Sequence, residues 1–472
     1  MKEMAFVLTL TISVAGSLSA GAYWLKQYGT AEEEAIATVV QTSNGGYLCG
    51  GTWCDWKSDG ENNHAWITRL KPDGAIASQR RYGSKLWSAG VSAALETPDG
   101  GTMVIGGAAG KFKTSVYGRS NALVMRLDKN GKIKWQKIFQ VSGWDAVINS
   151  GRLTADGGCV VAGFLIQEPD GEKNVGWVFK VDSLGKMQWQ KQFDYGQLTL
   201  ITYPEETNDG QFLCSGGIFI SQTSTTMDID ALLVLLGADG SLVWQKRIGT
   251  KNLIDLFVSA RPLDDGGYVA CGLYSSDLQK KGDQWLARFD AAGTLLWQKA
   301  FGNNKLWDLC VFAAPTSDGG FVVSGGYSTG AERFDGSLAR LDASGNLLWR
   351  RSVKAAVSTT AWTVWETTDG GFVSPLTVDA EEGADYDPIV LRTDKSGNLD
   401  SSCSSLISTA KGSIRNAAGK LATSNVKVSN TKATTLNGDL KPYSANGIMT
   451  TMCESYETEE MTSVEVEGTG DP

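Results

Sequence analysis

The chain has 472 residues with 56 glycines, 16 tryptophans and only 10 prolines, a composition typical of many short strands joined by tight turns. Its formal net charge is −9, but seven of its 52 acidic residues lie after Cys453, where no basic residue occurs. The remaining 45 acidic and 43 basic residues form a nearly neutral body, which lacks the positive charge of a nucleic-acid-binding protein.

Residues 1–22 have the pattern of a secretory signal peptide. Lys2 supplies a positive charge, residues 5–16 form a short apolar run, and residues 20–22 are small enough for a cleavage site. The apolar run is shorter than the roughly 20 residues of a spanning helix, and no later stretch is long enough to cross a bilayer. We therefore expect a secreted or periplasmic monomer with no membrane span, whose mature chain begins near Tyr23.

Residues 23–403 are built from an internal repeat. A tryptophan opens a WQK-like strand every 52 to 57 residues, if Ser78 is counted where the tryptophan is missing. Each repeat also carries an Asp-Gly-Gly type of turn, in which glycine supplies the positive φ of a tight hairpin. The tryptophans are Trp24, Trp135, Trp189, Trp244, Trp297 and Trp349, and the turns start at Asn44, Asp99, Asp156, Asp209, Asp265, Asp318 and Asp369.

Each repeat predicts four strands, such as GVSAALET, TMVIGGA, NALVMRLD and IKWQKIF. Sheets of this size bury both faces only when they stack around an axis, so the expected fold is an all-β, seven-bladed propeller. The last repeat lacks a WQK strand, while YWLKQYG stands alone at the start of the mature chain. We expect this N-terminal strand to complete the seventh blade, and each repeated tryptophan to pack between blades.

The Asp-x-x-Gly-x-x-x-Trp motif resembles the tryptophan-docking repeat of pyrroloquinoline-quinone-like propellers, which include quinoprotein dehydrogenases and the outer-membrane assembly lipoprotein. It occurs at residues 128–135, 182–189, 290–297 and 342–349. Compared with the quinoprotein pattern, the motif has one residue fewer between Asp and Gly and no Thr before that Gly. Exported repeat proteins with WxKxxG followed by TxDGGY are more similar. The resemblance implies a propeller fold.

The eight cysteines are of two kinds. Five lie within predicted strands and are expected to be small buried side chains, namely Cys49, Cys159, Cys214, Cys271 and Cys310. Cys403 and Cys453 instead bracket a Thr/Ser-rich extension, residues 404–453, and a disulfide between them would close it into a loop. The extension is either a few strands packed against the propeller or a flexible stalk. Cys54 has no assigned role, and residues 454–472 are expected to be a disordered acidic tail.

Catalytic signatures are missing from the sequence. His64 is the only histidine, which excludes metal sites built from several histidines, and no phosphate-binding glycine loop precedes a helix. We therefore expect a non-catalytic binding or scaffold propeller with an extracytoplasmic protein or glycan as its partner.

Recognition is expected on the face opposite the tight turns, where the loops are long and differ between repeats. Five tryptophans outside the repeated series map to this face and form the candidate partner site. Two are expected in the first loop and three at the entry to inner strands, where they could instead plug the central channel. They are Trp53, Trp56, Trp87, Trp144 and Trp307.

The alternative is a quinone- or Ca²⁺-dependent propeller oxidoreductase. Asp145, Asp255 and Asp308 each occur just ahead of an inner strand, so they could form an acidic ring that binds Ca²⁺ at the channel mouth. The simpler interpretation is that these carboxylates cap a loop or bond the next blade. We therefore predict no cofactor, with Ca²⁺ as the alternative.

Overall fold

The repeats fold into antiparallel strands, and the described part of the chain contains no helix. Within that part, no segment could cross a membrane as a helix. The computed structural model describes residues 23–454 except 30–32, 56–61, 85–86, 111–119, 168–170, 172, 197, 223–226, 278–280, 303–306, 331–332, 355–357, 380–387, 400–404, 410–412, 417–419, 424–426, 431–432, 438–440 and 445–447. The all-β class is thus confirmed.

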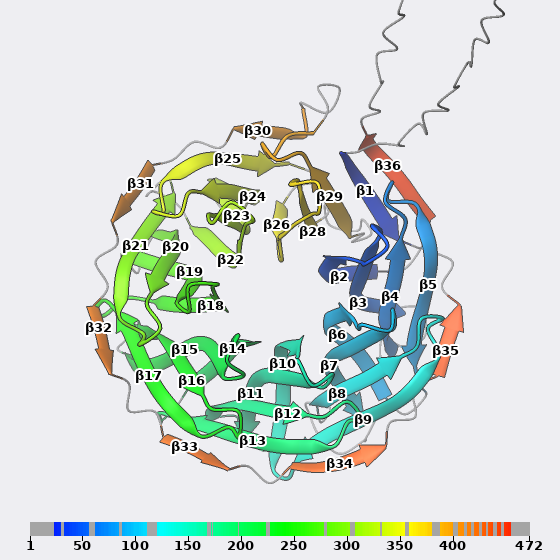
Figure 1. Cartoon of the computed structure of the whole chain (residues 1–472), viewed down its shortest axis with the longest axis horizontal. Helices are drawn as coiled ribbons and strands as arrows, with labels where there is room; N and C mark the ends of the chain where they lie inside the picture. The colour runs from blue at the N-terminus through cyan, green and yellow to red at the C-terminus, as the bar shows by residue number, and fades with distance from the viewer. Residues whose placement is uncertain are drawn as a thin grey trace, which may run out of the picture.

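The strands form units that lie around a central axis (Figure 1). The units are numbered in chain order. Units 1 to 3 consist of β2 (Glu33–Gln41), β3 (Tyr47–Asp55), β4 (Asn62–Leu70) and β5 (Ile76–Gly83); β6 (Trp87–Glu96), β7 (Thr102–Gly110), β8 (Ser120–Leu127) and β9 (Ile133–Val141); and β10 (Trp144–Leu153), β11 (Cys159–Gln167), β12 (Asn174–Val181) and β13 (Met187–Asp194).

Units 4 to 6 repeat this order, with the first strand innermost and the fourth outermost (Figure 1). They consist of β14 (Thr199–Glu206), β15 (Phe212–Gln222), β16 (Met227–Leu236) and β17 (Leu242–Gly249); β18 (Asp255–Pro262), β19 (Tyr268–Asp277), β20 (Lys281–Phe289) and β21 (Leu295–Gly302); and β22 (Asp308–Pro315), β23 (Phe321–Gly330), β24 (Arg333–Leu341) and β25 (Leu347–Val353).

Unit 7 combines strands from both ends of the repeat region. Its inner strand is split into β26 (Ser358–Ala361) and β27 (Trp365–Glu366), followed by β28 (Phe372–Asp379) and β29 (Ile389–Thr393). The N-terminal strand β1 (Trp24–Gly29) pairs with β29 in antiparallel register, with Trp24 opposite Arg392. Unit 7 therefore receives its fourth strand from the start of the chain.

The repeated tryptophans pack between units, as predicted. Each covers the glycine of the turn between the third and fourth strands of the next unit, so closely that a Cβ on Gly185 would lie 2.9 Å from the Trp135 ring. The Trp135 indole N–H donates to the Ser183 carbonyl of the same turn, at 3.0 Å. Where Ser78 replaces the tryptophan, the Tyr82 hydroxyl donates to the Gly131 carbonyl at 2.7 Å, as Tyr28 does to Gly74 beside Trp24.

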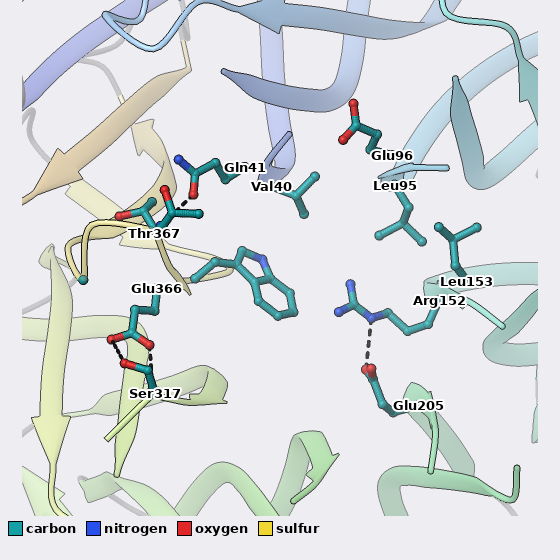
Figure 2. A pocket seen from close by; sticks show the side chains of 13 residues that line it. Val40, Gln41, Leu95, Glu96, Arg152, Leu153, Glu205, Ser317, Glu366 and Thr367 are labelled. Carbon is teal, nitrogen blue, oxygen red and sulfur yellow. Dashed lines mark hydrogen bonds and ion pairs between the residues drawn. The ribbon is translucent and has the colours of Figure 1, made fainter. Parts of the chain in front are cut away.

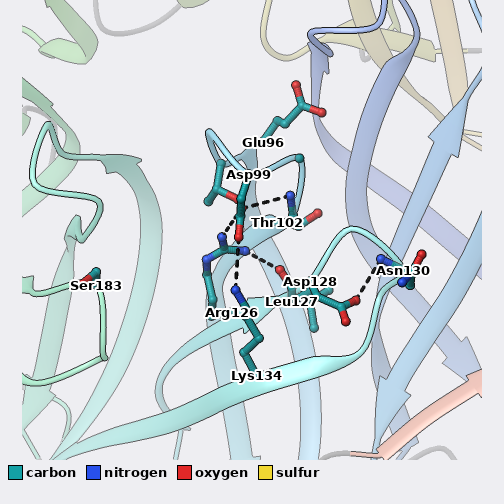
Figure 3. Close-up of polar contacts among 12 residues, drawn as sticks. Glu96, Asp99, Thr102, Arg126, Leu127, Asp128, Asn130, Lys134 and Ser183 are labelled. Atoms are coloured by element: carbon teal, nitrogen blue, oxygen red, sulfur yellow. Dashed lines mark hydrogen bonds and ion pairs between the residues drawn. The ribbon is translucent and has the colours of Figure 1, made fainter.

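In five units, a charged side chain of the third strand holds the Gly-Gly turn, as Arg126 does in unit 2 (Figure 3). Asp99 accepts hydrogen bonds from Thr97, Arg126 and Lys134, which hold the pKa of its carboxyl well below the usual range. Asp128 follows Arg126 closely in sequence but accepts from the Asn130 and Lys132 amides of its own turn. Arg126 and Asp128 therefore bond different groups, although they are close in sequence. Equivalent pairs are Lys180–Asp156, Arg288–Asp265, Arg340–Asp318 and Arg392–Asp369.

Neighbouring units are also linked at the end of their inner strands. A Gln or Glu side chain accepts a hydrogen bond from the second amide of the preceding unit's turn, at 2.6 to 2.9 Å. Between units 2 and 3 both partners are lost together, since Pro98 has no N–H and Leu153 has no acceptor. The acceptor and donor pairs are Gln41–Thr368, Glu96–Ser43, Glu206–Ala155 and Glu366–Ser317.

The C-terminal extension forms short strands along the outer circumference (Figure 1). We call residues 407–454 the belt. Its strands are β30 (Ile407–Thr409), β31 (Ser413–Asn416), β32 (Lys420–Thr423), β33 (Lys427–Asn430), β34 (Ala433–Asn437), β35 (Lys441–Ser444) and β36 (Ile448–Glu454). The sequence left two alternatives for the extension, packed strands or a flexible stalk, and the structure has strands packed against the ring.

Candidate binding site at the centre of the ring

The inner strands place one residue per unit at an equivalent position near the axis. The position is the last but one of each strand, which sets Arg152 opposite Val160, Glu205 opposite Leu213 and Arg261 opposite Val269. In unit 7 the equivalent residue is Trp365, opposite Val373. Three other units have small or apolar side chains there, Val40, Leu95 and Ala314.

Four of these side chains form one cluster across the channel, which we call the central cluster. The Glu205 carboxylate binds Arg152 at 3.0 Å and Arg261 at 3.3 Å. The guanidinium carbons of Arg152 and Arg261 lie 4.6 Å and 4.5 Å from the centre of the Trp365 ring. Cation–π contacts of this length are attractive, and desolvation strengthens them.

The central cluster carries a fixed positive charge. Burial lowers the pKa of Arg152, but the Glu205 carboxylate and Tyr203 beside it raise that pKa further, so the net shift is upward. Burial raises the pKa of Tyr203 to about 12, so its hydroxyl keeps its proton. Two guanidinium groups and one carboxylate therefore give these three side chains a net charge of +1.

A cavity of about 640 Å³ lies against the central cluster (Figure 2). Arg152, Glu205 and Trp365 contribute to its lining, together with the apolar side chains of Val40 and Leu95. Its other carboxylates are already bound. Glu96 accepts from the Ser43 amide and pairs with Arg69, and Glu366 accepts from Ser317.

The central cluster has more hydrogen-bond donors than acceptors. Arg261 Nε and Nη1 and Trp365 Nε1 are buried and have no acceptor among the residues that the structure describes. A buried N–H without an acceptor costs free energy, and these three atoms are closed to solvent.

The five tryptophans of the predicted partner site do not share one environment. Trp53 lies in β3, where only 6% of its surface is exposed, and not in a loop as expected. It packs against the His64 ring at 5.4 Å, with the Arg81 guanidinium 4.0 Å above it. The alternation of β3 turns this side chain inward, which corrects the prediction of an exposed residue.

Three of the other tryptophans remain candidates. Trp87 and Trp144 begin the inner strands β6 and β10 and are half-buried, and Trp307 lies just before β22 against Gly282. They therefore lie at the end of the inner strands opposite the central cavity. Trp56 lies outside the described residues.

The predicted acidic ring is not brought together. Asp255 and Asp308 each lie two residues before the bulge of their inner strand, whereas Asp145 lies three residues before it. A shift of one residue turns a side chain to the other face of a strand, so the recurrence in the sequence is misleading. In the part of the chain that the structure covers, no three Asp, Glu, His or Cys side chains form a metal site.

Each of these aspartates has a local partner, in agreement with the simpler interpretation. Asp255 accepts from the Thr250 and Ser275 amides, and burial raises its pKa to about 7. Asp308 accepts from the Ser328 amide, and Asp145 accepts from the Ser120 amide of the preceding unit. The Ca²⁺ site at these three residues, which is the alternative interpretation, stays a prediction.

The cysteines of the ring lie where the sequence placed them. Cys49, Cys159, Cys214, Cys271 and Cys310 are all buried, and burial raises the pKa of the Cys214 thiol to about 12. Cys453 lies in β36 opposite Leu25, whereas Cys403 lies outside the described residues. Its disulfide with Cys453 stays a prediction.

Sequence reasoning missed the central cluster. Arg152, Glu205, Arg261 and Trp365 come from four different units, and no two of them share a motif. The only signal in the sequence is that charged or bulky residues occupy a position that holds Val, Leu or Ala in units 1, 2 and 6. Aligning the inner strands by the distance to the Gly-Gly turn would have placed them in one layer.

The comparisons with known proteins support the repeat type. The family model described as outer membrane protein assembly factor BamB matches residues 72–280, which is less than half of the chain. The match confirms repeats of the pyrroloquinoline-quinone-like, outer-membrane assembly type that the Asp-x-x-Gly-x-x-x-Trp motif predicted. No curated protein matches the chain.

Solved structures similar to this one share little sequence with it. A mutant puromycin hydrolase complexed with PGG has a TM-score of 0.41 and 14% identity, over 74% of this chain and 50% of that one. An ACO/RPE65 chimera has a TM-score of 0.40 and 13% identity, over 80% of this chain and 94% of that one. The chain thus spans about half the length of the hydrolase.

Proposed function

We propose that this chain is a non-catalytic binding propeller of seven blades, closed by β1 and exported from the cytoplasm. The numbered units correspond to the blades. Support for closure comes from Trp24, which packs on Gly74 in unit 1, and from the Gln41–Thr368 hydrogen bond between units 1 and 7. A closed ring leaves few open sheet edges and offers a rigid central site.

The central cluster is the observation that carries the function. A cavity of 640 Å³ is within the range of small-ligand pockets, about 300–1,000 Å³, and its lining combines polar side chains with the apolar Val40, Leu95 and Trp365. Such a cavity fits one extended group of a partner better than a flat protein surface. We assign the partner as an extracytoplasmic protein or glycan that inserts an acceptor-rich group here.

The expected inserted group is a carboxylate. Arg152 lines the cavity, and its ion pair with Glu205 leaves one of two guanidinium charges in the central cluster without a counter-ion. Acidic sugars and the C-terminus of a peptide both carry a carboxylate on an extended chain. Hydrogen bonds between a guanidinium and a carboxylate are among the stronger ones in proteins.

The test is a titration of the mature chain, residues 23–472, by calorimetry. The probes are tri-galacturonate and tri-galactose, and tripeptides with a free or amidated C-terminus. We expect binding of at least one carboxylate form, at least about tenfold weaker binding of its neutral counterpart, and loss with Arg152→Gln. Glu206→Gln is the control, because Glu206 lies beside Glu205 but bonds the Ala155 amide.

Two results would overturn the assignment. Equal binding of the carboxylate and neutral probes would show that the charge of the central cluster does not select the ligand. Absence of binding to all four probes would remove the cavity as the site for these chemical classes.

A second surface that could hold a partner is the loop face, which is the face of the ring opposite the tight turns. Trp87 and Trp307 are half-buried at the starts of β6 and β22, so each retains some accessible ring surface. We expect the double variant Trp87→Ala with Trp307→Ala to bind a protein partner more weakly. Binding of the four probes in the cavity should stay unchanged. A change in probe binding would show that the two ends of the ring are not independent.

A further inference from the structure

The belt adds one strand to the outer edge of every unit. All its pairings are antiparallel and involve the outermost strand of a unit. The pairs are β30–β25, β31–β21, β32–β17, β33–β13, β34–β9, β35–β5 and β36–β1. The belt therefore visits the units in reverse chain order and ends on unit 7 (Figure 1).

The spacing of the belt strands leaves little slack. Consecutive strands start six to eight residues apart, from Ile407 to Ile448. Seven extended residues span at most about 25 Å, and each such step must both pair with one unit and reach the next. The belt thus has a repeat of seven residues that is visible in its pairing, since Ile407, Ile414 and Leu421 each lie opposite an equivalent apolar residue of an outermost strand.

Main-chain pairing is the common element of these contacts. The belt strands have three to seven residues and are rich in Thr, Ser, Asn and Lys, without the alternation of apolar residues found in the ring. An outermost strand offers a row of unpaired N–H and C=O groups, to which any extended chain can add. Each belt strand covers part of such a row.

We propose that the belt is a β-augmentation ligand carried by the chain itself, which seals the outer edges of all units and fastens the closing strand β1. The segment that occupies these outer edges is the belt itself, residues 407–454. Strand β1 is central to this role, because it lies between β29 on one side and β36 on the other. The ring is thus held shut by both ends of the chain, independently of what the central cavity binds.

The test cuts the belt from the ring in the full chain. A protease site inserted after Ser404 allows cleavage of the folded protein in the presence of reductant, so that a Cys403–Cys453 bridge cannot hold the fragment. We expect the belt fragment to co-elute with the ring in gel filtration and to leave it only in denaturant. Immediate separation of the two fragments would overturn the proposal.

A proline pair tests whether main-chain pairing is responsible. Thr434 and Thr435 lie opposite Gln140 and Phe139 in the β34–β9 ladder. Because alternate N–H groups face the neighbouring strand, changing both to Pro removes at least one ladder bond. In the cleaved protein, we expect Thr434→Pro with Thr435→Pro to release the belt at a urea concentration at least about 1 M lower.

The matched control is Thr434→Ala with Thr435→Ala, which alters the same side chains and keeps both N–H groups. We expect this pair to release the belt at nearly the wild-type urea concentration. Equal behaviour of the proline and alanine pairs would overturn the proposal, because side chains and not the backbone would then hold the belt.

Discussion

The inner and outer rims of the ring are held by different forces. At the inner rim, Arg152, Glu205, Arg261 and Trp365 depend on the identity of each side chain. At the outer rim, the belt strands pair through their backbones, and β35 even includes Pro442 in its ladder with β5. We therefore expect the inner rim to select a ligand by its side chains, and the outer rim to contribute to closure through main-chain pairing.

Deleting β1 is expected to have the largest effect. Trp24, Leu25 and Tyr28 are fully or almost fully buried, and burial of such side chains contributes about 1.5–3 kcal/mol each. The deletion also removes the strand on which both β29 and β36 pair. We expect loss of the cooperative thermal transition, measured by calorimetry. An unchanged transition would contradict closure through β1 and weaken the distinction between the rims.

Glu205→Ala tests the inner rim. Its loss leaves Arg152 and Arg261 without their shared carboxylate, and removing one partner of a largely buried ion pair costs about 3 kcal/mol. Glu206→Ala is the neighbouring control, which loses one hydrogen bond to the Ala155 amide and about 1 kcal/mol. Chemical denaturation measures both. Equal losses would show that the central cluster is not a unit.

Asp255 gives the start of an inner strand its own pH dependence. Burial raises its pKa to about 7, whereas in the unfolded chain it is about 4. Between about pH 4 and pH 7, the folded state therefore keeps the proton of Asp255, which the unfolded chain has already released. Its contribution to stability is complete below pH 4 and is lost as the pH rises to 7, by at most about 1.4 kcal/mol per pH unit.

Asp255→Asn should flatten this part of the stability profile, measured by denaturation at pH 4 to 8. The aspartates of the Gly-Gly turns give stability the opposite pH dependence. Hydrogen bonds from Lys180 and Thr154 outweigh the desolvation of Asp156 and lower its pKa to about 2, so its contribution is lost as the pH falls. A profile that Asp255→Asn leaves unchanged would contradict the burial argument.

Removing residues 455–472 is expected to have the smallest effect. This tail follows the last belt strand, and its acidic composition offers few apolar side chains to repay ordering. We expect the same unfolding midpoint for the shortened chain. A lower midpoint would mean that the outer rim extends beyond β36.

The sequence predicted those parts of the ring that depend on local repetition. Each Asp-x-x-Gly turn and its docking tryptophan recur at fixed spacing, so the strands and the contacts of Trp135 could be inferred before the structure. Residues such as Asp145 show the limit of this approach. Its position relative to a strand bulge, and not its recurrence in the sequence, decides which face it occupies.

The central cluster and the belt both depend on contacts between residues that are far apart in the sequence. Arg152 and Trp365 are more than two hundred residues apart and meet because their units lie across one channel. The belt has a seven-residue period, which is not the alternation typical of a strand and does not match the 52–57-residue repeat of the ring. The residues of this period lie opposite apolar residues of the outermost strands, and they are Ile407, Ile414, Leu421, Val428, Thr435, Pro442 and Met449. Composition alone therefore left its structure open between packed strands and a stalk.

The belt also sets an order of events during synthesis. Every strand of the ring precedes Ile407 in the chain, so all outer edges are complete before any belt strand can cover them. Until the last belt strands have left the ribosome, each nascent ring has edges open to pairing with another nascent chain. The interval between folding of the ring and pairing of the belt is therefore the period in which newly made molecules are most easily lost to aggregation.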